Sequence, residues 1–84
     1  MKLRELLENV QVVQATADMD MEIAHVAYDS RKVGEGDLFV AVTGFASDGN
    51  RFIPMAMEKG AACVVSAQPL PEGVPGVQVV SDRL

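Results

Sequence analysis

The chain has 84 residues, which allows one small domain and excludes most complete enzymes. Its 7 basic and 12 acidic side chains give a net charge of −5, which disfavours nucleic acid, because phosphate backbones are bound by clustered Lys and Arg. Cys63 is the only cysteine, and residues 1–7 are amphipathic rather than a purely apolar leader, so a cytoplasmic protein is expected. The longest apolar runs, residues 38–42 and 61–65, are far shorter than the roughly 20 residues that cross a bilayer, so we expect no membrane partner.

The charge is spread unevenly along the chain. Residues 1–29 hold 2 basic and 6 acidic side chains, residues 30–51 hold 3 of each, and residues 52–84 hold 2 and 3. The neutral middle is therefore the part that repels an anionic small molecule least.

A short amphipathic helix is predicted at the start of the chain. Leu3, Leu6 and Leu7 recur at the i, i+3, i+4 spacing of a helix with one buried face, and charged residues stand between them. We expect this helix to end near Asn9.

The first predicted strand covers residues 23–28, which contain no breaker and precede a polar loop over residues 29–37. Gly34 and Gly36 predict a tight turn in that loop. The continuous apolar run 38–42 then predicts a strand that is covered on both faces, as in an α/β sheet.

A second polar loop, residues 43–50, leaves this strand and leads into a predicted helix. Asp48 or Asn50 could cap the helix, and Pro54 falls in its first turn, where a missing N–H is harmless. Gly60 would end it. Its inner stripe would consist of Phe52, Ile53, Ala56 and Met57.

Residues 61–65 predict the next buried strand, which completes a strand–helix–strand crossover. A loop rich in Pro and Gly precedes one more strand over residues 77–80. Ser81 looks like the N-cap of a helix with nothing following it, so we expect a chain cut from a longer protein. The predicted fold class is α/β, a small three-layer domain with a mostly parallel sheet of about four to five strands.

Both polar loops follow the carboxyl ends of predicted strands, where open α/β sheets bind their ligands. Ser30 and Ser47 offer hydroxyl groups there, and Gly44 and Gly49 let the backbone approach a ligand closely. The candidate partners for an anion are Arg31, Lys32 and Arg51. These residues suit binding better than catalysis.

Other chemistries find little support. The chain contains neither a P-loop nor a Gly-x-Gly-x-x-Gly motif, and His25 and Cys63 each lack a second His or Cys for a metal site. Both residues, like Met55 and Met57, are interpreted as structural or packing residues. Asp29 could contact a ligand or shape its loop as an Asx turn, and Asp48 could contact a ligand or cap the helix.

Short stretches stand in a fixed order along the chain: Tyr28-Asp29-Ser30-Arg31, Gly36-Asp37-Leu38-Phe39-Val40-Ala41, Gly44, Asp48-Gly49, Phe52-Ile53, Ala56 and Gly60-Ala61. In this order and spacing they resemble the N-terminal domain of the Mur ligases, and the resemblance covers essentially the whole chain. Within that family, the Asp-Ser-Arg form and the Asp-Gly pair favour the ligase that adds the third residue of the peptidoglycan stem peptide. The alternatives are the sister ligase that adds D-alanyl-D-alanine and a non-catalytic α/β binding module.

The resemblance implies a domain that holds the UDP end of UDP-N-acetylmuramoyl-L-alanyl-D-glutamate. Tyr28 and Ser30 would contact the uridine. The second loop would approach the uracil and diphosphate through Phe45, Ala46 and Ser47, with Phe45 either stacking on the base or packing beside it. Supporting positions would be Asp29, Arg31, Gly44 and Asp48.

The resemblance also implies what lies outside this chain. A central domain would bind ATP with Mg²⁺, and a C-terminal domain would bind the incoming amino acid. The 84 residues alone would then hold no cofactor, metal or catalytic residue, and would be inactive as a peptide ligase.

Overall fold

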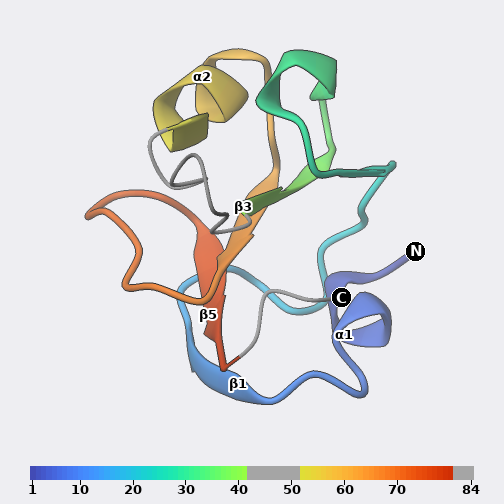
Figure 1. Ribbon diagram of the computed structural model, residues 1–84. Coiled ribbons are helices and arrows are strands. Elements are labelled where there is room, and N and C mark those ends of the chain that lie inside the picture. The colour runs from blue at the N-terminus through green and yellow to red at the C-terminus, as the bar shows by residue number, and fades with distance from the viewer. Residues whose placement is uncertain (42–51, 81–84) are drawn as a thin grey trace.

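A computed structural model describes residues 1–41 and 52–80 of the chain. Their elements follow in chain order as helix α1 (Leu3–Leu6), strands β1 (Val12–Ala15) and β2 (Val26–Ala27), the 3₁₀ turn η1 (Ser30–Lys32), strand β3 (Leu38–Ala41), helix α2 (Ile53–Glu58) and strands β4 (Cys63–Ser66) and β5 (Gly76–Val79). Figure 1 shows their arrangement around one sheet.

The sheet has five strands in the order β1-β5-β4-β3-β2. The strands β2, β3, β4 and β5 pair in parallel, whereas β1 pairs antiparallel with β5 at one edge. The parallel neighbours β3 and β4 are joined through α2, which confirms the predicted strand–helix–strand unit. The α/β class and the mostly parallel sheet are thereby confirmed.

Both faces of the sheet are covered by packed side chains. Successive side chains of a strand point to opposite sides, so each strand contributes to both faces. On β3, Leu38 and Val40 pack towards α1, while Phe39 and Ala41 pack towards α2. The α1 side contains Leu3, Leu7, Ile23, Leu38, Val40, Cys63, Val65, Val77 and Val79. The α2 side contains Ala27, Val33, Phe39, Ala41, Ile53, Ala56, Ala61 and Val64. The three-layer prediction is therefore confirmed.

Strand β1 is missing from the sequence-based prediction. Its sequence, Val-Val-Gln-Ala, does not alternate apolar and polar side chains, which agrees with the exposure of all four residues. The hydroxyl group of Thr16, just after the strand, accepts a hydrogen bond from Gly76 N–H (3.1 Å) and donates to the carbonyl oxygen of Val74 (3.1 Å). These bonds attach the segment to the start of β5, which lies 60 residues along the chain.

Several element boundaries differ from the prediction. Helix α1 ends at Leu6 rather than near Asn9. The strand expected over residues 23–28 is shortened to β2. The residues before β2 pair elsewhere: Glu22 forms a bridge with Lys2, and the N–H group of Ala24 donates a hydrogen bond to the carbonyl oxygen of Gly36 in the following loop.

Helix α2 carries the predicted inner stripe and ends as predicted. Ile53 and Ala56 are buried, with Phe52 and Met57 packed beside them. Gly60 follows the C-cap residue Lys59 with φ of +99°, a conformation that side chains with a Cβ resist. The N-cap position, however, is Phe52 rather than Asp48 or Asn50, both of which lie outside the described residues, as does Ser81.

Candidate functional site

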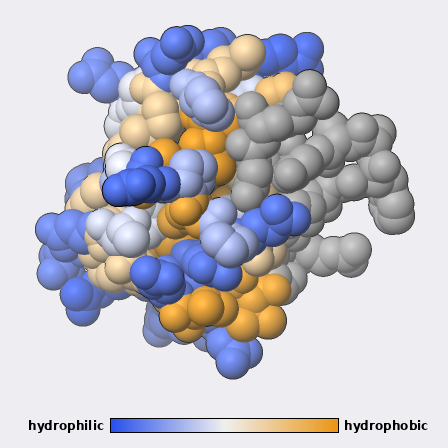
Figure 2. Space-filling view, turned by 90° about the vertical axis from the view of Figure 1, so that its left-hand side faces the viewer, coloured by the Kyte–Doolittle hydropathy of each residue, from blue (hydrophilic) through white to orange (hydrophobic). Residues whose placement is uncertain are grey.

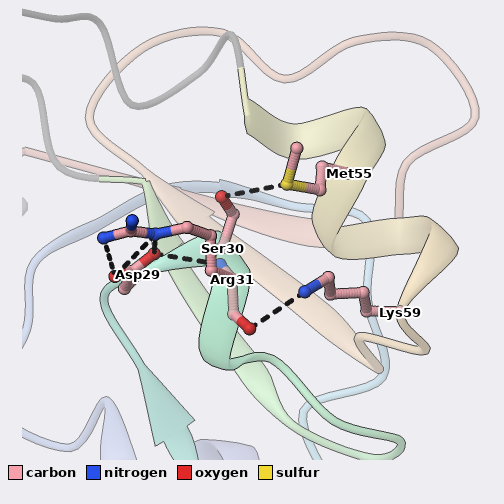
Figure 3. A network of polar contacts seen from close by, with 5 residues as sticks. All are labelled: Asp29, Ser30, Arg31, Met55 and Lys59. Carbon is pink, nitrogen blue, oxygen red and sulfur yellow. Dashed lines mark hydrogen bonds and ion pairs between the residues drawn. The ribbon is translucent and has the colours of Figure 1, made fainter.

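The turn η1 lies directly beyond the end of β2 and is shaped by the carboxylate of Asp29. Asp29 is the N-cap residue of this turn, and its Oδ1 atom accepts a hydrogen bond from the backbone N–H of Arg31 (2.9 Å). The Arg31 guanidinium reaches the same carboxylate through Nε (3.1 Å) and Nη2 (2.9 Å), as Figure 3 shows. The side-chain and backbone hydrogen bonds from Arg31 lower the pKa of Asp29 to about 2. Asp29 therefore has the structural role that the Asx-turn interpretation predicts.

Ser30 lies under helix α2 and is almost completely buried. Only 5% of its surface is exposed, and its hydroxyl group donates a hydrogen bond to Met55 Sδ over 3.6 Å. Met55 itself is 41% exposed, so interpreting it as a packing residue is wrong, while Met57 does pack against the core. No local pattern in the sequence signals this contact, because it joins residues 25 positions apart on two different elements.

A second bond from α2 holds the turn in place. Lys59 Nζ donates a hydrogen bond to the carbonyl oxygen of Arg31 over 2.9 Å (Figure 3). Ser30 and Arg31 are thus attached to α2 at Met55 and Lys59, which lie about one helical turn apart. These two contacts join η1 to α2, beside the apolar packing of Val33 with Ile53 and Ala56 in the core.

Tyr28 stands beside this turn with 55% of its surface exposed. It lines a hollow of about 390 Å³ that runs along β2. The same hollow is lined by Asp29, Lys32, His25 and Asp37. Tyr28 and Lys32 therefore place an aromatic ring and an ammonium group on one exposed surface.

His25 has a partner in the same hollow that the sequence did not indicate. Its Nδ1 atom lies 3.5 Å from Asp37 Oδ1, while Asp37 Oδ2 accepts a hydrogen bond from the N–H group of Gly34.

The structure thus brings four of the predicted site residues together at the end of β2: Tyr28, Asp29, Ser30 and Arg31. The predicted site residues of the second loop lie outside the described residues: Gly44, Phe45, Ala46, Ser47 and Asp48, together with the further candidates Gly49 and Arg51. That loop leaves β3, the strand next to β2 in the sheet.

A larger hollow of about 470 Å³ lies at the opposite edge of the sheet, between β1, β5 and the loop over residues 69–75. Gln14, Gln78 and Glu72 are among its lining residues, and none of the described residues that line it is basic. At the lower end of the molecule in Figure 2, apolar side chains reach the surface. The exposed apolar residues at the β1 and β5 ends are Val12, Val13 and Val80. This edge therefore suits a diphosphate less well than the surface beside η1.

Metal and thiol chemistry find no site in the part of the chain that the structure describes. No group of three or more His, Cys, Asp and Glu side chains gathers there in a way that could hold a metal ion. Burial raises the pKa of the Cys63 thiol to about 12, which agrees with a packing residue. Within the same residues, no helix is long and apolar enough to span a bilayer.

Comparison with known proteins gives this geometry its context. A family model described as the Mur ligase family, catalytic domain, matches residues 22–82. The chain is 44% identical over 86 residues to a UDP-N-acetylmuramoyl-L-alanyl-D-glutamate--2,6-diaminopimelate ligase of Bacteroides fragilis, covering 99% of this chain and 18% of that relative. It is 42% identical over 87 residues to a UDP-N-acetylmuramyl-tripeptide synthetase of Roseiflexus sp., covering 100% of this chain and 17% of that relative.

Solved structures show the same fold. MurF from Acinetobacter baumannii superposes with a TM-score of 0.81 at 20% identity, over 98% of this chain and 18% of that chain. MurF ligase from Thermotoga maritima, solved in complex with ADP, superposes with a TM-score of 0.66 at 32% identity, over 75% of this chain and 15% of that chain. The chain spans less than a fifth of the length of the relatives described here. On the family match and these identities, the chain belongs to the Mur ligase family.

Proposed function

We propose that the 84 residues form the N-terminal, UDP-binding domain of a ligase that adds the third residue of the peptidoglycan stem peptide. Its ligand would be the UDP end of UDP-N-acetylmuramoyl-L-alanyl-D-glutamate, the compound that the name of the Bacteroides relative contains. The observation that carries the proposal is the Asp29-Ser30-Arg31 turn, which stands beyond the carboxyl end of β2 beside an exposed tyrosine. Open α/β sheets bind their ligands at such ends.

The uridine contacts are proposed for Tyr28 and Ser30. A nucleobase needs an apolar wall and a few fixed polar groups. The half-exposed ring of Tyr28 can supply the wall, and the hydroxyl of Ser30 can supply a polar group in a fixed position. Phe45, Ala46 and Ser47, in the loop after the neighbouring strand, complete the proposed set.

Affinity for the diphosphate must come from local donors, because the chain carries a net charge of −5. Lys32 lines the same hollow as Tyr28. Arg31 stands on the same turn, although two of its nitrogens are engaged by Asp29. We therefore propose Lys32 as the first candidate among the described residues, with further donors in the second loop or in the rest of the protein.

The remaining steps are proposed to reside outside this chain. ATP and Mg²⁺ would act in a central domain, the incoming amino acid would bind in a C-terminal domain, and the enzyme would work in the bacterial cytoplasm. The 84 residues alone are then expected to show neither ligase activity nor ATP hydrolysis. ATP hydrolysis by the purified chain would contradict the proposal that the ATP site lies in another domain.

The Ser30→Ala substitution in the full-length enzyme tests the site. Loss of one hydrogen bond to the ligand should raise KM for the UDP-sugar about three- to tenfold and leave KM for ATP unchanged. An unchanged KM for the UDP-sugar would contradict the role of this hydroxyl. The Lys2→Met substitution is a control, because Lys2 lies in the N-terminal segment next to α1.

The sister ligase that adds D-alanyl-D-alanine is the second candidate, and the 32% identity with the Thermotoga MurF ligase favours it. Assays of the full-length protein with diaminopimelate, lysine and D-alanyl-D-alanine separate the two. Incorporation of diaminopimelate or lysine supports the first proposal, and incorporation of the dipeptide alone supports the second.

A further inference from the structure

The hydroxyl group of Ser30 has one hydrogen-bond partner among the described residues, the sulfur of Met55. A serine hydroxyl has one proton to donate and two lone pairs that accept. The proton of Ser30 is directed to Met55 Sδ over 3.6 Å. No residue in the ranges 1–41 and 52–80 donates a hydrogen bond to Ser30 Oγ, so the lone pairs have no donor among these residues while the proton is engaged.

The direction of the Ser30 hydroxyl group decides which nucleobase can form a hydrogen bond with it. On the pairing edge of uracil, N3–H is a donor and stands between two carbonyl acceptors. In cytosine the corresponding N3 is an acceptor. An oxygen that can only accept therefore pairs with uracil N3–H and repels cytosine N3, unless the hydroxyl first gives up its bond to the sulfur.

Resting on the proposed function, we propose that Met55 is a positioning residue for base selection. It holds the Ser30 proton on the side of α2, so that Ser30 Oγ accepts from N3–H and the site prefers uracil to cytosine. Ser30 itself is held in place, since it is 5% exposed and part of η1.

The test compares binding of UDP and CDP to the full-length protein by titration calorimetry. Met55→Leu retains the size of the side chain and removes the sulfur acceptor, so the Ser30 hydroxyl becomes free to turn and donate to cytosine N3. The ratio of the two dissociation constants should then fall about three- to tenfold, mainly through tighter binding of CDP. Met57→Leu is the matched control, because it makes the same change on the same helix at a residue packed against the core.

A second variant links the effect to the hydroxyl. In a Ser30→Ala background, Met55→Leu should leave the ratio of UDP to CDP affinity unchanged, because there is no longer a proton to position. A ratio that falls equally in both backgrounds would show that Met55 acts through packing and would overturn the inference.

The remaining outcomes separate the inference from the proposed function. If the wild-type protein binds UDP and Met55→Leu retains the full preference over CDP, the inference is wrong and the proposed function stands. Equal affinity of the wild-type protein for UDP and CDP would also overturn the inference alone. If the wild-type protein binds neither nucleotide, the proposed function itself is wrong.

Discussion

Lys59 Nζ donates a hydrogen bond to the carbonyl oxygen of Arg31 over 2.9 Å, which ties the end of α2 to the turn that carries Ser30. The bond spans 28 residues of sequence. Together with the contact between Ser30 and Met55, it makes α2 the element that positions the candidate site.

Replacing Lys59 by Met should loosen the turn without unfolding the domain. An exposed hydrogen bond contributes about 0.5–1 kcal/mol, so the free energy of unfolding in urea should fall by that amount. Amide hydrogen exchange should speed up at residues 31–33 more than in β3 or β4. Glu58→Gln, the neighbouring change on the same helix, is the control; equal exchange rates in Lys59→Met and wild type would contradict the role of this bond.

The carboxylate of Asp29 should make folding sensitive to acid. Hydrogen bonds from Arg31 lower its pKa to about 2 in the folded chain, below the ordinary value of about 4 for an unfolded aspartate. A group whose pKa is depressed by folding stabilises the fold above the unfolded pKa and loses that contribution as the pH falls towards the folded value. Stability should therefore decline between pH about 4 and about 2, and Asp29→Asn should remove part of this decline.

Carboxyl NMR titration checks the cause directly. Arg31→Met removes the guanidinium and retains the backbone N–H bond, so the pKa of Asp29 should rise towards its ordinary value without reaching it. A pKa of Asp29 that is the same in Arg31→Met and wild type would show that the ion pair is not the cause.

Gly60, directly after the end of α2, should be sensitive to substitution by a residue with a Cβ atom. A Cβ atom there would lie 2.9 Å from the Cα atom of Glu35, and φ is +99°. Gly60→Ala should therefore destabilise the domain by about 2 kcal/mol or more, of which the left-handed conformation accounts for about 1–2 kcal/mol. Gly73→Ala is the matched control, because φ is +84° and no atom lies within 4 Å of its Cβ position. Equal losses in the two variants by urea unfolding would contradict the importance of the close approach to Glu35.

Local sequence patterns predict the elements whose burial they reflect. Strand β3 is a continuous apolar run, and its four residues are all buried. Helix α2 is recognisable from its inner stripe and from Gly60. Strand β1 is not recognisable, because its residues are exposed and are held by bonds to the distant Gly76.

The candidate site is predictable from sequence only in part. The Asp29-Ser30-Arg31 motif and its place after a strand are readable from the sequence, and the structure forms them into one turn. The contact of Met55 with Ser30 and that of Lys59 with Arg31 are not readable, because they depend on how α2 packs over η1. The apolar side chain of Met55 on a predicted helix suggests a packing residue, although Met55 lies off the predicted inner stripe, and the structure exposes it.

Titration of UDP into the isotope-labelled 84-residue chain, followed by amide NMR, tests the central claim most directly. The dispersion of the spectrum reports at the same time whether the chain is folded. The account predicts saturable shifts at millimolar UDP that centre on Tyr28, Ser30 and the amides of residues 44–49. A dispersed spectrum that stays unchanged, or shifts that centre on Gln14 and Gln78 at the opposite edge of the sheet, would contradict it.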